Sequence, residues 1–323
     1  MWYVNHSAPN EMSLLRGEVT SPQKGQLRIR VAYAGVNRTD VYQLRGVYRP
    51  PHGANPIMGL EVSGIVDAIG EDVGEEWLGE RVCALVNGGG YAEYVVCSCE
   101  SCLIIPSDLP LSVAAGIPEA WFTAALFLHY IRPLSSNDRV LIHSVMSNVS
   151  RAAALLSQWV GANVWGTLGS ERKCDISSII DEKKVFFRNN DNWIQHLIDE
   201  SSKVDVIFDV VGASCFTANS KLINLYGTWL IVGFLSGAHP SNISLAPILF
   251  KQVTLRGATM RSQPQNVVKI LRDWLATQWK SGLLLPKTVC LNQIFELSQV
   301  EEAHRLLMDY QSVGKIVIHL SSD

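Results

Sequence analysis

Residues Val140 to Val160 read VLIHSVMSNVSRAAALLSQWV, and this stretch decides the fold. Its first residues are apolar and β-branched, which is typical of a buried strand, whereas Arg151–Val160 has the apolar spacing of a helix. Strand, tight turn and helix in this order form the unit that receives the pyrophosphate of a dinucleotide at the helix N-terminus. The segment therefore predicts a dinucleotide-binding α/β domain.

The turn of this unit lacks the glycines that normally let the backbone turn tightly and approach the phosphates. Val145, Asn148 and Ser150 stand in their places. Asn148 tolerates a left-handed backbone and is expected to keep the turn, whereas a β-branched Val145 would be strained at a positive φ. Each forced non-glycine conformation costs about 1–3 kcal/mol.

Two outcomes are open for this loop. Ser150 adds a Cβ where helix and strand approach closely, although its hydroxyl could instead donate to a phosphate. Either the loop keeps room for a pyrophosphate and binds it more weakly, or Val145 and Met146 fill the space and binding is lost.

Length and composition indicate a soluble protein of two domains. The chain has 323 residues, of which 47% are hydrophobic and 18% charged. A net charge of -3 gives no case for a nucleic-acid partner. We find no signal peptide and no uncharged apolar run of the roughly 20 residues that span a bilayer. The 7 cysteines, an odd number, favour reduced thiols and a cytoplasmic location without a membrane partner.

The first block of the chain, to about Ala120, is rich in short strands separated by Gly and Pro. This pattern predicts a barrel-like all-β unit. The expected strands are Gln26–Val36, Glu61–Gly70, Arg81–Val86 and Tyr91–Val96.

The second block, about 121 to 261, alternates strands and helices and so predicts a parallel sheet with helices on both faces. Its expected strands are Val140–His143, Asn163–Thr167, Val204–Val211 and Trp229–Phe234, and its helices include Ala152–Trp159 and Trp193–Glu200. The third block is expected to hold helices at Asn266–Trp279 and Gln299–Tyr310 and a strand at Gly314–Leu320.

Five motifs in a fixed order carry a family resemblance. They are AGVNRTD at Ala34–Asp40, GVYRPP at Gly46–Pro51, MGLEVSG at Met58–Gly64, GGYAEY at Gly89–Tyr94 and GKIV at Gly314–Val317. With this order of elements, nearly the whole chain resembles the medium-chain dehydrogenase/reductase superfamily. Within it, the chain is most similar to the zinc-independent, zeta-crystallin-like quinone oxidoreductases, in particular the tumour-suppressor-inducible type.

The resemblance implies an α/β protein of two domains. A GroES-like β-barrel domain would comprise residues 1–120 and 262–323, and a Rossmann domain with a doubly wound parallel sheet would comprise residues 121–261. Family members commonly form homodimers by joining the edge strands of their Rossmann sheets, which would place the dimer contact near Ile243–Val253.

No bound metal is expected. The zinc enzymes of this superfamily have cysteine at the position of Asn37 and histidine at that of Leu60, and Glu61 alone cannot hold the ion. Three further cysteines, Cys97, Cys99 and Cys102, could in principle bind zinc, but we interpret them as strand-end thiols. If they lie close together, oxidation to a disulfide is possible.

The implied cofactor is NADP(H). In the resembling family Ser170 and Lys173 mark NADP, and Arg188 replaces a common tyrosine and would add a cation near the phosphate. Alternatively, Arg172, Lys173 and Arg188 are solvated surface charges, and Thr123 is a helix residue that bonds back to its own turn. The cofactor contacts implied by the resemblance are Thr123, Ser147, Asn148, Val149, Ser170, Lys173, Arg188, Gly212, Phe234, Met260 and Lys315.

Without a metal to polarise a carbonyl, quinones and α,β-unsaturated carbonyls are the expected hydride acceptors, since these need only a hydrogen-bond donor for the developing oxyanion. The resemblance assigns this role first to Tyr48, then to Tyr42 and to the amide of Asn37. Tyr48 could instead anchor the Pro50–Pro51 turn.

Two other functions are compatible with the sequence. The altered turn favours a non-catalytic or cofactor-impaired binding module, whereas the retained Tyr48, Asn37, Ser170 and Lys173 argue against it. A detached enoyl-reductase module of the polyketide-synthase type would use the same fold and hydride chemistry. The substrate is not encoded in any motif that we recognise.

Overall fold

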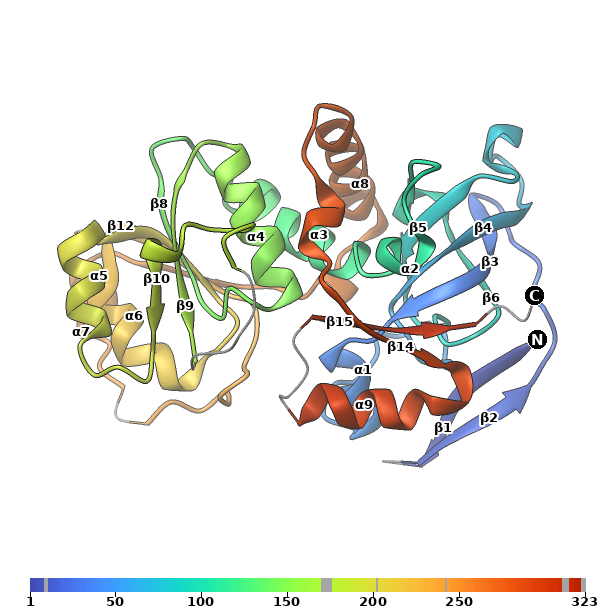
Figure 1. Cartoon of the computed structure of the whole chain (residues 1–323), viewed down its shortest axis with the longest axis horizontal. Coiled ribbons are helices and arrows are strands. Elements are labelled where there is room, and N and C mark those ends of the chain that lie inside the picture. Colours follow the sequence, from blue (N-terminus) through green and yellow to red (C-terminus); the bar gives the residue numbers. More distant parts are fainter. Residues whose placement is uncertain (9–10, 170–175, 202, 242, 310–313, 321–323) are drawn as a thin grey trace. The chain divides into compact units, whose positions relative to one another are not determined.

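The computed structural model describes residues 1–8, 11–169, 176–201, 203–241, 243–309 and 314–320. The chain forms two compact units (Figure 1), of which unit 1 comprises Met1–Phe122 with Arg261–Asp323 and unit 2 comprises Thr123–Met260. The α/β class predicted from the sequence is confirmed.

Unit 2 contains a six-stranded sheet in the order β10-β9-β8-β11-β12-β13, and all of its strand pairs are parallel. The strand order reverses between β8 and β11, and ligands of such sheets bind beyond the carboxyl ends of the strands at that point. The strands are β8 Arg139–Ile142, β9 Asn163–Leu168, β10 Val185–Phe187, β11 Val204–Asp209, β12 Ile223–Ile231 and β13 Thr254–Gly257.

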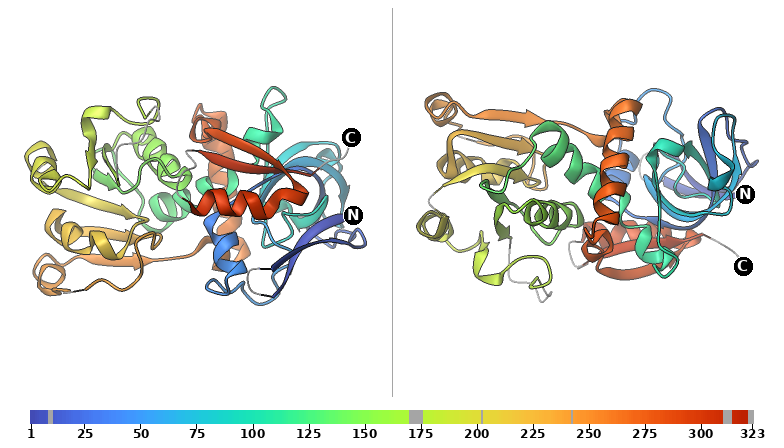
Figure 2. Two further views of the ribbon diagram at one scale, coloured as in Figure 1. Left: turned by 60° about the horizontal axis from the view of Figure 1, so that its bottom comes forward. Right: turned by 90° about the horizontal axis from the view of Figure 1, so that it is seen from above.

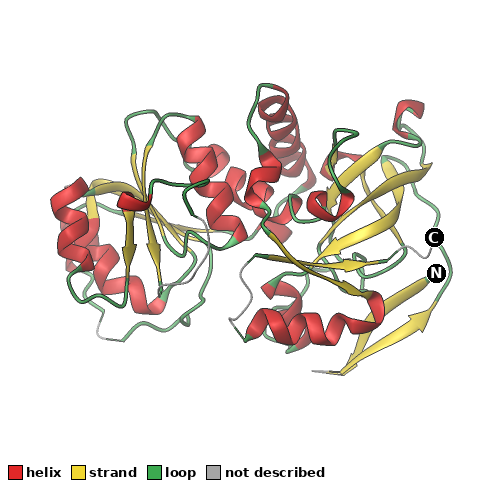
Figure 3. Ribbon diagram, viewed as in Figure 1, coloured by secondary structure: helices red, strands yellow, loops and turns green. Residues whose placement is uncertain are grey.

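Helices cover this sheet (Figure 3), and apolar side chains hold them in place. Leu141 and Ile207 of the sheet pack with Leu197 of α5 and Leu222 of α6 in one buried cluster. Each such side chain contributes about 1.5–3 kcal/mol by leaving water. The helices are α4 Asn148–Trp159, α5 Trp193–Ser201, α6 Phe216–Leu222 and α7 Ala246–Phe250.

Unit 1 is built around a seven-stranded sheet drawn from both ends of the chain. Its main path is β14-β15-β3-β4-β5-β7, with β6 paired to β3, and β1 and β2 form a separate hairpin. Along β3, Leu27, Ile29 and Val31 point into the core while the residues between them are less buried. The strands are β1 Trp2–Ala8, β2 Glu11–Arg16, β3 Gln26–Gly35, β4 Glu61–Ile69, β5 Arg81–Leu85, β6 Tyr94–Ser98, β7 Cys102–Ile104, β14 Leu291–Glu296 and β15 Lys315–His319.

The helices of unit 1 come from both chain ends as well (Figure 2). Helix α9 contacts α1, β14 and β15, so the C-terminal segment packs on the N-terminal segment within unit 1. The helices are α1 Arg38–Leu44, α2 Leu111–Ala114, α3 Pro118–Ala125, which crosses the boundary between the units, α8 Gln265–Lys280 and α9 Val300–Met308.

One helical segment, Leu111–Ile131, is long and apolar enough to cross a membrane by length and composition alone. The segment contains one acidic residue, Glu119. In its most apolar stretch of 18 residues, 78% of the residues are buried inside the structure. A buried core helix passes the same test, so this segment is weak evidence for a membrane span.

Candidate functional site

The turn after β8 forms without glycine by placing its left-handed residue elsewhere than expected. Ser144 has φ 50°, while Asn148 is the first residue of α4 and Val145 does not have a positive φ. The expectation that Asn148 would carry the left-handed conformation was therefore wrong. The strain anticipated at Val145 does not arise, because the chain reverses one residue earlier.

Val145 packs into the interior of unit 2. Its side chain is fully buried, and its Cγ1 lies 3.0 Å from the point where a Cβ on Gly166 would stand. Gly166 belongs to β9, the neighbouring strand. A glycine on β9 thus makes room for the valine in the turn, so Val145 does not fill the space outside the loop.

Ser150 joins helix and strand at their close approach. Its hydroxyl donates to the carbonyl oxygen of His143 at 2.9 Å, so that proton is unavailable to a phosphate. Ser147 is the N-cap of α4: its Oγ accepts from the Ser150 amide at 3.2 Å and donates to Ser150 Oγ at 2.8 Å. Both hydroxyls are therefore bonded within the turn, and the expected phosphate contact of Ser147 stays a prediction. Asn148 and Val149 lie in the first turn of α4, whose amides face an anion in this type of fold.

A buried polar chain crosses the carboxyl edge of the sheet. Arg188 Nη1 donates to Thr167 Oγ1 at 2.6 Å, and Thr167 Oγ1 lies 2.8 Å from His143 Nδ1. His143 Nε2 lies 2.7 Å from Asn219 Oδ1, and Asn219 Nδ2 donates to Asp209 Oδ2 at 2.9 Å. No sequence pattern predicts these hydrogen bonds, because the five residues come from five separate segments of the chain.

The partners fix the protonation of His143. Asn219 Oδ1 can only accept, so His143 carries its proton on Nε2 and receives the Thr167 hydroxyl proton at Nδ1. Burial lowers the pKa of His143, in agreement with a neutral ring. Arg188 Nη2 reaches Ser144 Oγ at 3.2 Å, which places a guanidinium beside the turn rather than on the surface.

Asp209 organises the next turn, as expected. Its Oδ1 accepts the amides of Val211 and Gly212, and its Oδ2 also accepts Trp229 Nε1. Gly212 has φ 83°, and a Cβ there would lie 2.8 Å from the Gly237 carbonyl oxygen, so glycine is required.

The other expected cofactor contacts in unit 2 differ in exposure. Phe234 is 53% exposed, which excludes a core role, whereas Thr123 and Met260 are buried. Ser170 and Lys173 lie outside the described residues, as does Arg172.

In unit 1 a buried carboxylate, Glu61, gathers two of the predicted site residues. Its Oε1 accepts from Lys315 Nζ at 2.5 Å and from Asn37 Nδ2 at 3.0 Å. Lys315 Nζ also donates to Val36 O and Asn37 Oδ1, at 3.0 and 2.9 Å. These bonds use all three N–H groups of the ammonium, so Lys315 has an internal role in unit 1, and its expected cofactor contact stays a prediction.

Asn37 has a similar internal role. Its amide donates to Glu61 and, at 3.4 Å, to the carbonyl oxygen of Gly35. Both amide protons are thereby engaged inside the protein, and the expected donation of Asn37 to a substrate stays a prediction. The residue instead precedes α1 and positions its first turn.

Glu119 is a member of this cluster that sequence reasoning missed. Its backbone amide donates to Glu61 Oε2 at 2.9 Å. Burial, reinforced by the negative charges of Glu61 and Asp40, raises the pKa of Glu119 to about 8, so the carboxyl is protonated at neutral pH. A signal was available, because Glu119 is the single acidic residue in the apolar stretch Leu111–Ile131.

Tyr48 is paired with a fixed cation. The guanidinium carbon of Arg261 lies 5.8 Å from the centroid of the Tyr48 ring. Arg261 Nε donates to Asn87 Oδ1 at 2.7 Å and Nη1 to Gln43 Oε1 at 2.5 Å, while Nη2 is buried without a hydrogen-bond partner. A guanidinium held by two neutral amides, with one nitrogen free, is built to receive negative charge. Tyr42 lies at the same turn, where its carbonyl oxygen accepts the amides of Val47 and Tyr48.

The residues at the positions of zinc ligands serve the core. Leu60 is buried, Asn37 is bonded as above, and no group of three ligand-type side chains gathers in the described part of the chain. Cys97 Sγ and Cys102 Sγ lie 3.6 Å apart as free thiols, so the two do approach, whereas Cys99 is only partly buried.

Comparison with known proteins identifies both parts of the chain. Residues 23–107 match the alcohol dehydrogenase GroES-like domain and residues 149–277 match the zinc-binding dehydrogenase family. The synaptic vesicle membrane protein VAT-1 homolog-like of Mus musculus is 27% identical over 328 residues, covering 96% of this chain and 78% of its own. The quinone oxidoreductase of Sus scrofa is 27% identical over 307 residues, covering 93% and 90%.

Two solved structures share the fold closely. The CurK enoyl reductase has a TM-score of 0.86 at 21% identity, covering 99% of each chain. The Escherichia coli quinone oxidoreductase, solved with NADPH, has a TM-score of 0.81 at 19% identity, covering 98% of each chain.

The fit between Val145 and Gly166 yields a test. We expect Gly166→Ala to lower the free energy of unfolding of unit 2 by about 1–3 kcal/mol, because the new methyl overpacks against Val145. In a Val145→Ala background the same change should cost at least about 1 kcal/mol less, measured by urea unfolding as a double-mutant cycle. Gly257→Ala is the matched control, since a Cβ there meets nothing closer than 3.7 Å. Equal costs of Gly166→Ala in both backgrounds would show that the two residues do not compensate.

Proposed function

Because this chain belongs to the medium-chain dehydrogenase/reductase superfamily, we propose that it is an NADPH-dependent, zinc-independent oxidoreductase whose hydride acceptor is a quinone or an α,β-unsaturated carbonyl. Oxidoreductases are its relatives, including the quinone oxidoreductase of Sus scrofa. The observation that carries the proposal is the turn after β8, which forms without glycine and buries Val145 inside unit 2.

The cofactor fits the residues at the carboxyl edge of unit 2. The first turn of α4 offers amides to the pyrophosphate, and Arg188 stands beside Ser144 with its guanidinium fixed by Thr167. Arg188 stands at the end of β9, where its backbone amide donates to the carbonyl oxygen of Leu168 at 2.8 Å. This arrangement supports a 2′-phosphate, and hence NADP(H), over a ribose diol. The bound cofactor would supply the hydride.

The acceptor is polarised by Tyr48 and Arg261. The hydride leaves negative charge on the acceptor oxygen, and preorganised donors aimed at that oxygen lower the barrier. The Tyr48 hydroxyl is the donor, and the neighbouring guanidinium stabilises the developing charge through its free Nη2. Asn37, Glu61 and Lys315 position the start of α1, which carries the chain toward Tyr48.

Two neighbouring functions share this chemistry or this fold. An enoyl thioester accepts hydride like a quinone, and an enoyl reductase is among the structures with this fold. A non-catalytic module would lack cofactor binding altogether, and that is what a nucleotide titration decides.

We propose further that the protein is a cytoplasmic homodimer. Around the expected contact, Ile243, Leu245, Leu249 and Phe250 are 47–76% exposed, an apolar surface beside the edge strand β13. Contiguous exposed apolar surface of this kind marks association sites.

Nucleotide titration tests the cofactor assignment. We expect micromolar binding of NADPH and weaker binding of NADH, measured by calorimetry. Arg188→Gln should weaken NADPH binding by about tenfold or more, equivalent to about 1.4 kcal/mol, and NADH binding much less. Arg139→Gln at the opposite end of β8 is the control, because Arg139 pairs with Asp205. No binding of NADPH at millimolar concentration would instead favour the non-catalytic module.

Steady-state kinetics with a soluble para-quinone test the donor. Tyr48→Phe and Arg261→Gln should each lower kcat by about 10²-fold, the usual effect of losing one oxyanion donor, while the Kd for NADPH is unchanged. Tyr33→Phe is the control, since Tyr33 stacks on His319 on β15. If kcat is unchanged in Tyr48→Phe, Tyr48 takes no part in the reaction. If kcat falls in Tyr42→Phe but not in Tyr48→Phe, the hydrogen-bond donor is Tyr42.

Sedimentation tests the dimer. We expect the mass of two 35.7 kDa chains for the native protein and of one chain for Leu249→Glu, because a charge would be buried in the contact. Leu78→Glu, at a comparably exposed leucine in unit 1, should remain dimeric. A native mass of one chain contradicts the assembly.

A further inference from the structure

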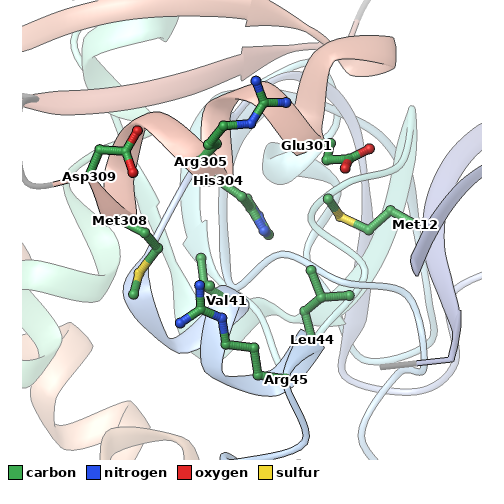
Figure 4. Close-up of a pocket in the computed structure, with 9 residues that line it drawn as sticks. All are labelled: Met12, Val41, Leu44, Arg45, Glu301, His304, Arg305, Met308 and Asp309. Atoms are coloured by element: carbon green, nitrogen blue, oxygen red, sulfur yellow. The ribbon is translucent and has the colours of Figure 1, made fainter. Parts of the chain in front are cut away.

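A cavity of about 230 Å³ opens in unit 1 between α1 and α9 (Figure 4). Val41 and Arg45 of its lining lie close in sequence to Tyr42, but the cavity is lined by none of the predicted site residues, and nothing in the proposed function so far uses it. The volume would hold several water molecules, each of about 30 Å³ in the liquid. The residues that line it are Met12, Val41, Leu44, Arg45, Glu301, His304, Arg305, Met308 and Asp309.

His304 is the buried polar residue of this cavity. It is 4% exposed, and its ring points from α9 toward Val41 and Leu44 of α1 (Figure 4). Nδ1 is buried without a hydrogen-bond partner, whereas Nε2 lies 3.1 Å from the hydroxyl of Tyr91. A buried unsatisfied polar atom costs about 1–3 kcal/mol, so an orphan ring nitrogen on a residue that lines a cavity points to a partner that enters through that cavity.

The chain of hydrogen bonds continues from Tyr91 into the interior. The Tyr91 hydroxyl donates to Asp40 Oδ2 at 2.9 Å, and the same carboxylate oxygen accepts the backbone amide of Asn37 at 2.8 Å. Since the only hydroxyl proton of Tyr91 goes to Asp40, His304 must donate from Nε2. Nδ1 is then the acceptor, which gives the chain one direction, from the cavity to Asp40.

Resting on the proposed function, we propose that His304, Tyr91 and Asp40 form the path by which the proton consumed in the reduction enters the protein. Hydride transfer leaves an anion on the acceptor, and one proton per hydride completes the product. A water-borne proton binds Nδ1 of His304, the Nε2 proton moves to the Tyr91 oxygen, and the Tyr91 proton moves to the Asp40 carboxylate. From Asp40 the proton passes to the anion left on the acceptor, and no electron is exchanged along the path.

The proton affinities suit this sequence. Burial lowers the pKa of His304 to about 4, so the ring is neutral at pH 7 and transfers a proton by exchanging its tautomers. Burial raises the pKa of Asp40 to about 6, against the opposing hydrogen bonds of Asn37 and Tyr91, so this carboxyl can both take up and release a proton near neutrality. Burial raises the pKa of Tyr91 well above its usual value, so its two proton transfers are concerted.

Charges surround both ends of the path. At the cavity the cations and anions are equal in number, so their net effect on His304 is small. At the inner end, Asp40 interacts with Lys315 and Glu61, and its charge is felt by Glu119 and Arg261 beside Tyr48. The charged groups at the cavity are Arg45, Glu301, Arg305 and Asp309, and those near Asp40 are Glu61, Glu119, Arg261 and Lys315.

A single-turnover experiment tests the path. NADPH-loaded protein is mixed with a soluble para-quinone, and NADPH absorbance reports hydride transfer while a pH-indicator dye reports proton uptake. The native protein should take up one proton with each hydride. His304→Ala should slow proton uptake by about 10²-fold, in the range of a lost proton-transfer group, and added imidazole should restore it through the cavity.

Two further variants separate proton transfer from folding. His304→Gln retains a donor for Tyr91 but exchanges no proton, so its uptake should be slow and insensitive to imidazole. Met308→Leu changes the cavity wall outside the path and should behave as the native protein. Proton uptake at the native rate in both His304 variants overturns the proposal.

An infrared measurement distinguishes failure of this path from failure of the proposed function. After a pH jump from 8 to 5 without nucleotide, the carbonyl stretch of protonated Asp40, identified by its loss in Asp40→Asn, should appear about tenfold or more later in His304→Gln than in the native protein. If the native protein consumes no NADPH but this delay is present, the reductase assignment fails and the path stands. Equal appearance rates overturn the path, whether or not the protein reduces quinones.

Discussion

The buried carboxylate of Glu61 is the interaction on which unit 1 depends. It lies at the start of β4 and holds Lys315 of β15, Asn37 before α1 and the amide of Glu119 in α3. Removing one partner of a buried ion pair costs about 3–5 kcal/mol, because the other charge is left without compensation. The two carboxylate oxygens of Glu61 thus join segments that are far apart in the chain. The positions of Tyr48 and Asp40 follow, since both belong to the α1 segment that Asn37 anchors.

The same cluster satisfies the polar groups that surround Glu61 in the interior of unit 1. An ammonium and an amide supply the positive and polar contacts around Glu61, and the donors of both are fully engaged. In unit 2 the comparable constraint is the chain of hydrogen bonds from Arg188 to Asp209, which ties four strand ends through three neutral side chains between a guanidinium and a carboxylate. In both clusters the buried polar side chains are hydrogen-bonded to one another, as buried polar groups generally are.

Sequence patterns predicted the regular elements well and the site only in part. Strands such as β3, β4 and β11 were evident because alternation or a continuous apolar run is a local property of the chain. Short elements with little pattern were missed, among them β10 at Val185–Phe187 and α1 at Arg38–Leu44. Ser144 was missed as the left-handed residue, because the φ of a turn depends on where the flanking strand and helix end. The contacts of Lys315 and Asn37 with Glu61 were not predicted, since Glu61, 24 residues from Asn37, is brought to them only by sheet pairing. Glu119 carried a local signal, a lone acid in an apolar helix, that the sequence interpretation did not use.

The pairing of β15 with β3 has a consequence for synthesis. Unit 2 is one continuous stretch of chain, and all of its strands exist once residue 260 has left the ribosome. Unit 1 cannot complete its sheet at that stage, because Val317 and Ile318 must pair with Gly35 and Ala34. Strands made early therefore keep an unpaired edge until Lys315–His319 has been translated, and an unpaired edge is the feature that recruits other chains. We therefore expect unit 2, which is inserted between the two parts of unit 1, to fold first. The nascent N-terminal strands of unit 1 are then the segment that most needs a chaperone.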